Sequence, residues 1–165
     1  MAAEKGAGRT VVSDKGGERY DIVATDTLDC APSQLWAVLS DFERFVDVGL
    51  SGMASGFRWL TGGPGLAPAT FEFTVADVVL KEEVYELTSD GASDRYRLRY
   101  RALEPALGVL EYDAVLDVEP SANGTTLLTA VRSVRMAPGV APDMLAGMVD
   151  AEMQSLADHL GEATR

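Results

Sequence analysis

The sequence is poor in the residues that build metal centres and covalent catalysts. It contains one cysteine, Cys30, and one histidine, His159. A single cysteine excludes an intramolecular disulfide and gives no basis for a cysteine-ligated metal cluster. No serine lies in a nucleophile-elbow motif, so a serine–histidine–acid triad cannot be argued. We therefore predict chemistry, if there is any, that uses no metal and no cofactor.

Each of the two single residues has a structural explanation. Cys30 precedes Ala31-Pro32 at the end of a predicted strand, where a small apolar side chain suits packing. His159 falls in the last turn of a predicted helix, and a histidine there interacts favourably with the helix C-terminus. A catalytic role for His159 is the alternative.

Long apolar runs and an excess of basic residues are also missing. No run approaches the roughly 20 apolar residues that span a bilayer, and the N-terminal residues lack the apolar core of a signal peptide, so we expect a cytoplasmic protein. The formal net charge of −12 argues against binding to nucleic acid or to an anionic membrane surface. Solubility alone would explain this charge.

The C-terminal stretch is the clearest element that is present. Pro142 and Asp143 suit the first turn of a helix, and apolar residues then recur on one face as far as Leu160. Glu152 interrupts this face between Val149 and Leu156, where a core helix would carry a leucine. Either the face meets water there or a carboxylate lies in an apolar space.

The rest of the chain predicts one domain. A length of 165 residues with 47% hydrophobic content suits a single core, which we assign to residues 19–165. Residues 1–18 are rich in glycine and mixed charges, and we predict a flexible tail for them. A first strand over Tyr20–Leu28 then precedes two short helices within residues 32–46. The glycine-rich region from Gly49 to Gly65 is predicted to be either a lid or an edge strand.

Five more strands follow with alternating side chains. Arg95, Arg97, Arg99 and Arg101 share one side of a strand whose other side carries Tyr96, Leu98 and Tyr100. A hairpin turning at residues 105–107 would place Arg101 against Glu111, Arg99 against Asp113, Arg95 against Asp117 and Tyr100 against Tyr112. This pairing predicts a solvated charge ladder rather than an anion site.

The last strand, residues 125–136, follows the turn sequence Asn123-Gly124. If the alternation continues through the turn, Arg132 points inward, and the opposite choice leaves Arg132 in water. Short connections require antiparallel pairing. The predicted fold is α+β, with a seven-stranded curved antiparallel sheet wrapped around the long C-terminal helix and two short helices after the first strand.

The segment LDCAPSQLWAVLSDFERF resembles the opening of the START/SRPBCC superfamily, in which a strand runs into Ala-Pro and then a helix with Leu-Trp and Asp-Phe. The later Glu83-Val84-Tyr85-Glu86-Leu87, the tyrosine-rich strand and the final helix match its order, over about residues 20–160. The branch it most resembles is the bacterial polyketide cyclase/dehydrase-like group. This resemblance implies a helix-grip fold with an apolar cavity between sheet and helix. Members bind lipids, hormones or polyketides, act as cyclases, or serve as carriers.

Strand alternation supplies candidates for such a cavity. Burying a charge without a partner costs several kcal/mol, so the polar candidates are the more informative ones. We assign catalytic roles to Glu152, Arg132 and Asp26, where Asp26 and Arg132 could pair if the first and last strands are neighbours, as the resemblance implies. The predicted ligand-binding residues are Trp59, Phe71, Phe73, Glu83, Tyr85, Tyr96, Leu98, Tyr100, Tyr112, Met148, Val149 and Leu156.

Two functions are compatible with these residues. One is an enzyme for aldol cyclisation and dehydration of a polyketide, with a desolvated Glu152 of raised pKa as the base and Arg132 or a tyrosine as donor to an enolate. The other is a binding protein that shelters a hydrophobic, partly oxygenated ligand. We expect a small-molecule partner and a monomer or homodimer.

Overall fold

Residues 9–163 are described by a computed structural model and form eight strands and three α-helices. In chain order the elements are β1 (Arg9–Gly16), β2 (Arg19–Leu28), α1 (Pro32–Leu39), α2 (Phe42–Gly49), β3 (Ala54–Thr61), β4 (Ala69–Val75), β5 (Val78–Asp90), β6 (Arg95–Ala102), β7 (Val109–Pro120), the 3-10 turn η1 (Ala122–Gly124), β8 (Thr126–Met136) and α3 (Asp143–Ala163).

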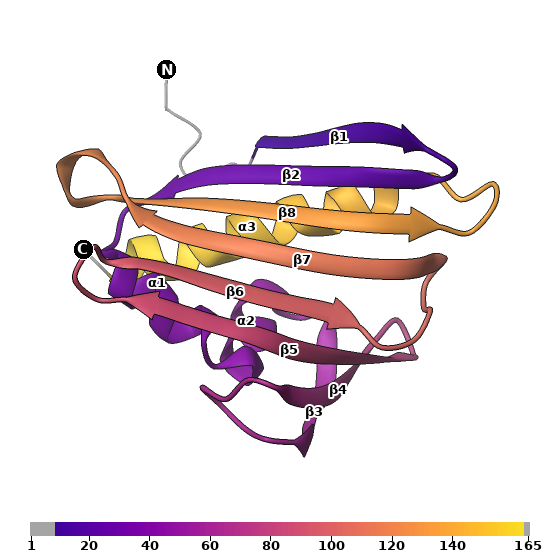
Figure 1. The fold of residues 1–165 in the computed structure, drawn as a ribbon, viewed down its shortest axis with the longest axis horizontal. Helices are drawn as coiled ribbons and strands as arrows, with labels where there is room; N and C mark the ends of the chain where they lie inside the picture. The colour runs from indigo at the N-terminus through magenta and orange to yellow at the C-terminus, as the bar shows by residue number, and fades with distance from the viewer. Residues whose placement is uncertain (1–8, 164–165) are drawn as a thin grey trace.

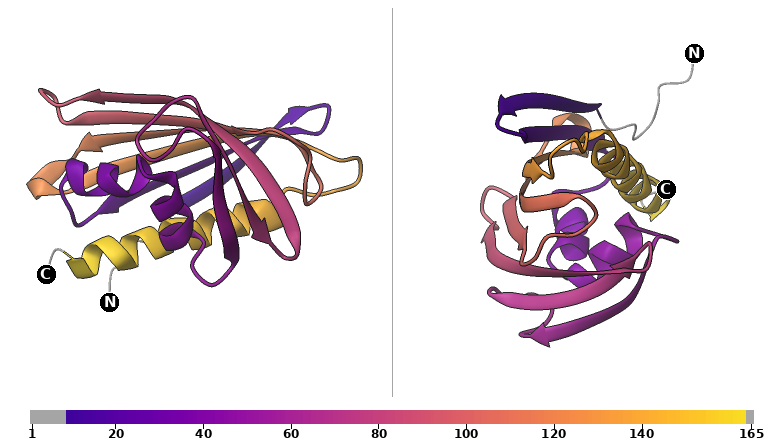
Figure 2. Two further views of the ribbon diagram at one scale, coloured as in Figure 1. Left: turned by 90° about the horizontal axis from the view of Figure 1, so that it is seen from below. Right: turned by 90° about the vertical axis from the view of Figure 1, so that its right-hand side faces the viewer.

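The strands form one antiparallel sheet in the order β1-β2-β8-β7-β6-β5-β4-β3. The sheet curves, and the three helices lie on its concave side, with α3 running along the strands (Figures 1 and 2). This arrangement confirms the predicted α+β helix-grip architecture. No helix within residues 9–163 is both long enough and apolar enough to cross a membrane.

The sheet has eight strands where seven were predicted, because β1 occupies part of the predicted flexible tail. Its residues pair with β2 through a turn in which Gly16, Gly17 and Glu18 all have positive φ. The hydroxyl of Thr10 also donates a hydrogen bond to Asp150 on α3. Backbone pairing thus orders a segment whose side chains bury little apolar surface. The predicted tail is wrong for residues 9–18, and residues 1–8 lie outside the described residues.

Helices α1 and α2 form where the sequence predicts them. The side chain of Gln34 accepts a hydrogen bond from the Ala31 backbone N–H at 2.8 Å, and Asp41 accepts one from the Arg44 N–H at 3.5 Å. These contacts satisfy N–H groups that helix starts leave free. Buried apolar residues then hold both helices against the sheet.

The region from Gly49 to Gly65 contains an edge strand. Its centre is β3, which pairs only with β4 at the end of the sheet order. Trp59 on β3 packs edge-on against Phe71 on β4, with ring centroids 5.6 Å apart. This resolves the choice between a lid and an edge strand for the part that β3 covers.

The β6–β7 hairpin keeps the predicted faces but differs in register by two residues. Arg101 lies opposite Asp113 and Arg97 opposite Asp117, while Tyr100 lies opposite Ala114 rather than Tyr112. The cause is the turn, which is formed by Leu107 and Gly108 with φ of 54° and 78°. Two backbone hydrogen bonds between Ala106 and Val109 close it. The centre of the hairpin therefore lies after the predicted one at residues 105–107.

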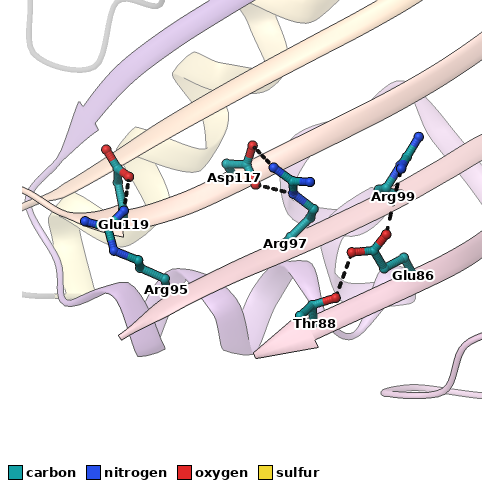
Figure 3. A network of polar contacts seen from close by, with 7 residues as sticks. All are labelled: Glu86, Thr88, Arg95, Arg97, Arg99, Asp117 and Glu119. Atoms are coloured by element: carbon teal, nitrogen blue, oxygen red, sulfur yellow. Dashed lines mark hydrogen bonds and ion pairs between the residues drawn. The ribbon is translucent and has the colours of Figure 1, made fainter. Parts of the chain in front are cut away.

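The charge ladder itself forms on the convex face of the sheet (Figure 3). Its pairs are Arg95–Glu119 at 2.5 Å, Arg97–Asp117 at 2.7 Å, Arg99–Glu86 at 3.9 Å and Arg101–Glu83 at 2.8 Å. The arginine side chains are between 38% and 59% exposed, so the ladder is solvated as predicted.

Alternation along β8 continues through η1 and directs one row of its side chains inward. Thr126, Leu128, Ala130, Arg132 and Val134 are all buried, and Arg132 is completely so. On α3, Val149, Met153, Leu156 and Leu160 are buried in the same core, and Glu152 among them is only 8% exposed. Of the two alternatives for Glu152, the structure therefore has the carboxylate in an apolar space rather than in water.

Candidate functional site

An apolar cavity lies between the concave face of the sheet and helices α2 and α3. Its volume is about 110 Å³, and its lining includes Phe45, Phe73, Met136, Met148 and Val149. The cavity is smaller than the roughly 300–1,000 Å³ that usually enclose a drug-sized ligand. In this conformation the cavity has room for only part of such a ligand.

Besides the exposed ion pair of Lys81 and Glu104, five polar side chains line the wall of this cavity: Glu82, Tyr100, Tyr112, Arg132 and Glu152. We call these five the polar cluster. Each comes from a different element, respectively β5, β6, β7, β8 and α3. The sheet therefore brings four of these side chains to its concave face, and the helix supplies the fifth.

An ion pair between Arg132 and Glu152 is the centre of the polar cluster. Nη2 of Arg132 contacts Oε1 of Glu152. Burial alone would lower the pKa of Arg132, but Glu152 and the two tyrosines raise it well above its ordinary value. Arg132 is therefore a permanent buried cation whose charge Glu152 compensates.

The two tyrosines complete the surroundings of the guanidinium. Nε of Arg132 donates to the Tyr112 hydroxyl at 2.8 Å, and Nη2 donates to the Tyr100 hydroxyl at 3.3 Å. The hydroxyl oxygens are 3.1 Å apart, so one hydroxyl can donate to the other. Burial raises the pKa of both tyrosines, which keeps both protons in place. One of the two protons therefore has no acceptor in the tyrosine pair and can serve a ligand oxygen.

Arg132 also has an unused donor. Its Nη1 atom is buried and has no hydrogen-bond partner among residues 9–163. A buried donor without a partner costs about 1–3 kcal/mol, so a ligand acceptor at this position would recover that free energy. Nη1 and the tyrosine proton are therefore two donors that the polar cluster itself leaves unused.

Glu82 is the member of the polar cluster that sequence reasoning missed. It is 9% exposed, whereas its neighbour Glu83, the predicted cavity residue, bonds to Arg101 in the outer ladder. A β-bulge at Tyr85 reverses the alternation, since Val84 pairs with Tyr100 and Glu86 with Arg99. The prediction followed the alternation of Glu83, Tyr85 and Leu87, which holds only after the bulge.

A signal for Glu82 was present at the other end of the same strand. Val78, Leu80 and Val84 share its parity, and an alternation started from Val78 places Glu82 inward. Two competing alternations within one strand are the mark of a bulge.

Burial gives Glu82 unusual acid–base properties. The pKa of Glu82 is raised from the ordinary 4.5 to about 8. Desolvation is the main cause, the charge of Glu152 adds to the shift, and Arg132 opposes it. At neutral pH most of the protein therefore carries Glu82 as a neutral carboxylic acid. A carboxyl with a pKa near the working pH can both give and take a proton.

Seven of the predicted site residues line the cavity: Phe73, Tyr100, Tyr112, Arg132, Met148, Val149 and Glu152. Phe71, Leu98 and Leu156 are fully buried core residues, and Trp59 packs against the core beside Phe71. Tyr96 stacks on Trp36 with centroids 5.2 Å apart. None of these five contacts the cavity.

Glu83 and Tyr85 lie on the convex face, so their predicted place in the cavity is wrong. The Tyr85 hydroxyl donates to Asp113 at 2.7 Å, and its ring lies beneath the guanidinium groups of Arg99 and Arg101. Glu83 precedes the bulge and Tyr85 lies at it, so both side chains face the outer ladder.

Asp26 does not pair with Arg132. Strands β2 and β8 are neighbours, but Ile22 lies opposite Arg132 and Asp26 lies opposite Leu128. Four residues of strand separate the two positions by about 13 Å. Burial raises the pKa of Asp26, against an opposing hydrogen bond from the Thr27 backbone, and its Oδ2 atom has no partner among residues 9–163.

The remaining candidates for chemistry lie away from the cavity. Cys30 is buried, and desolvation raises the pKa of its thiol, as suits a packing residue. His159 is exposed on α3. Within residues 9–163, no group of three or more His, Cys, Asp or Glu side chains could hold a metal ion.

Comparison with known proteins agrees with this architecture. A solution NMR structure of a protein from Thermobifida fusca has a TM-score of 0.68 and 18% identity, covering 86% of this chain and 93% of that one. A structure of a protein from Nitrosospira multiformis has a TM-score of 0.67 and 16% identity, covering 88% and 99%. These similarities concern the fold.

No curated protein matches this chain in sequence. Residues 19–163 match the family model described as polyketide cyclase / dehydrase and lipid transport. A family of this description suggests a hydrophobic ligand. The match extends from β2 to the end of α3, and the chain therefore belongs to this polyketide cyclase / dehydrase and lipid transport family.

Proposed function

We propose that the protein binds a hydrophobic, partly oxygenated carbonyl compound in the cavity and catalyses proton transfer on it, as in the cyclisation or dehydration of a polyketide. The observation that carries this proposal is the buried Glu82 carboxyl, whose pKa is raised to about 8 and which lies beside a guanidinium and two tyrosines on a largely apolar wall. Such a wall can hold a carbonyl oxygen while the carboxyl moves a proton.

Dehydration of a β-hydroxy ketone illustrates the chemistry. The ionised form of Glu82 removes the proton between the two oxygenated carbons, and the electron pair moves onto the carbonyl oxygen as an enolate. Nη1 of Arg132 and the spare tyrosine proton stabilise that oxygen. The protonated Glu82 then gives its proton to the departing hydroxyl, so that water leaves, the enone forms and Glu82 is ionised again.

We assign different roles to the two buried carboxylates. Glu152 accepts a hydrogen bond from Arg132. This contact orients the guanidinium, and the carboxylate compensates its charge. Glu82 takes the role of base that the sequence suggested for Glu152, and it also acts as the acid. Arg132 keeps its predicted role as donor to an enolate, and Asp26 has none in this proposal because it lies away from the polar cluster.

Ligand size sets a further requirement. The volume of about 110 Å³ accommodates one end of a polyketide-like molecule, so the rest must extend toward the mouth. Met136, Met144 and Met148 line the cavity, and unbranched methionine side chains adapt readily to new shapes. The oxygenated end would meet the polar cluster and the apolar body would contact the methionines.

The test compares Glu82→Gln with Glu83→Gln. These neighbours differ in the face of β5 that they occupy, and both changes preserve side-chain volume. With 4-hydroxy-4-phenylbutan-2-one as a probe, enone absorbance would report dehydration. We expect Glu82→Gln to lower the rate by about 10²-fold or more and Glu83→Gln to leave it unchanged. Wild-type turnover that survives Glu82→Gln would overturn the assignment.

A carrier function is the second candidate. Met144 at the mouth is 59% exposed, and Val140 on the adjoining loop is 37% exposed, as suits a surface over which an apolar ligand passes. Native mass spectrometry of the purified protein would test it. A bound small molecule that leaves unaltered, together with no turnover of β-hydroxy ketones, would favour the carrier.

A further inference from the structure

We propose that Gly49, the last residue of α2, is a positioning residue that leaves the space in which Glu152 reaches Arg132. This inference rests on the proposed function, because it concerns the charge balance around Glu82. A methyl group placed on Gly49 would lie 2.9 Å from Cγ of Glu152. Carbon atoms pack at about 3.5–4.0 Å, so the two groups could not coexist without movement.

The backbone of Gly49 does not itself require glycine. The residue is helical and its φ lies outside the positive region, so alanine would fit the conformation and would favour the helix. The side chains of Phe45 come no closer than 3.4 Å to the added methyl group, which is tolerable contact. Glu152 is therefore the neighbour that makes glycine necessary.

Glu152 cannot move away from Gly49 without disturbing its ion pair with Arg132. Its carboxylate is held against Nη2 of Arg132, and its side chain is only 11% exposed. Moving Cγ far enough to admit a methyl group would pull the carboxylate from the guanidinium. The Arg132 charge would then lose its compensation inside the cavity.

Moving Glu152 would change the pKa of Glu82, which belongs to the same polar cluster. Two charged groups act on the pKa of Glu82, Arg132 on β8 and Glu152 on α3, and Glu82 in turn raises the pKa of Tyr100 on β6 and Tyr112 on β7. Glu152 raises the pKa of Glu82 and Arg132 lowers it. If Glu152 moves away, its charge raises the pKa of Glu82 less, and the uncompensated charge of Arg132 lowers it more. Both changes favour ionised Glu82.

The experiment is an NMR titration of the Glu82 side-chain carboxyl carbon in the full-length ¹³C-labelled protein, with Glu82→Gln identifying the signal. The wild-type midpoint is expected at about 8. Gly49→Ala should lower it by about one pH unit or more, the size that nearby charges produce. Gly147→Ala on α3 is the matched control, since a methyl group there meets nothing within 4 Å, and its midpoint should equal that of wild type.

A folded Gly49→Ala protein with the wild-type midpoint would overturn the proposal. If Gly49→Ala does not fold, the same change is made in an Arg132→Met/Glu152→Ala background, which removes both the Cγ atom and the ion pair. There Gly49→Ala should leave the melting temperature unchanged or higher, and a further loss of folding would contradict the role of Glu152. The titration needs no substrate, so it is independent of the activity test, in which turnover that survives Glu82→Gln would overturn the proposed function.

Discussion

The sheet carries arginine–carboxylate pairs on both faces, and the two sets differ in almost every physical respect. On the convex face, four arginines of β6 pair with acids of β5 and β7 in contact with water, and Figure 3 shows the pairs of Arg95, Arg97 and Arg99. On the concave face, Arg132 pairs with Glu152, and Arg132 is completely buried. Tyr100, on the inner side of β6, belongs to the second set.

The surroundings of an ion pair, rather than its residue types, decide how strongly the pair acts on its neighbours. In water a Coulomb attraction is weak and salt screens it, so the outer ladder contributes little beyond its register. In the interior, each charge has lost its hydration and depends on its partner. The inner pair can therefore alter the proton affinity of a neighbour such as Glu82, whose pKa is raised to about 8.

The largest expected effect comes from removing the inner cation. Arg132→Met keeps much of the side-chain length but leaves Glu152 buried without a counter-charge. We expect a loss of about 3–5 kcal/mol in the free energy of unfolding, measured by urea denaturation. A loss below about 1 kcal/mol would mean that the inner pair resembles the outer ones.

The second effect is a dependence of stability on pH. Since the pKa of Glu82 is about 8 in the folded protein and 4.5 ordinarily, the folded state holds a proton that the unfolded state has released between these values. Stability should therefore fall as the pH rises from 4.5 to 8, by roughly 1.4 kcal/mol per unit at most, and level off above 8. In Glu82→Gln this contribution disappears. Parallel urea-midpoint curves for the two proteins would contradict it.

The third effect compares one residue type on the two faces. Tyr112→Phe leaves Nε of Arg132 without its partner in the interior, which should cost about 1–3 kcal/mol. Tyr85→Phe removes the hydrogen bond to Asp113 on the convex face, where water can replace it, and should cost about 1 kcal/mol or less. Thermal unfolding of the two variants gives the comparison, and equal losses would speak against it.

The smallest effect belongs to the outer ladder. Arg97→Met breaks the pair with Asp117, whose two side chains are 48% and 41% exposed. The expected loss is about 0.2–1 kcal/mol at low salt, and most of it should vanish in 1 M NaCl. The loss in Arg132→Met should persist at the same salt concentration. A salt-independent loss in Arg97→Met would place the ladder in the same class as the inner pair.

Much of this arrangement could be predicted from the sequence. Strict alternation along β6 and β7 assigned the outer arginines correctly, alternation along β8 offered the buried Arg132 as one of two choices, and the helical spacing of α3 singled out Glu152. These patterns are local, and each buried face repeats them over many residues. The order of the elements followed from the same periodicities.

The remainder depended on features that alternation does not encode. The bulge at Tyr85 moved Glu82 inward and Glu83 outward, and the turn at Leu107-Gly108 shifted the register of β6 and β7. The partner of Glu152 was set by which residues of β8 and α3 meet in space, which placed Arg132 there and left Asp26 aside. Strand β1 was missed because backbone pairing orders it without a row of buried side chains.

The proposed chemistry depends on a Glu82 carboxyl that is buried and remains protonated at neutral pH. The most direct test is an NMR titration of the Glu82 carboxyl carbon in the wild-type protein without ligand, from pH 3 to pH 10. A midpoint near 8 is the predicted result. A midpoint near 4.5, the value of an ordinary glutamate, would contradict the claim and remove Glu82 as the proposed acid and base.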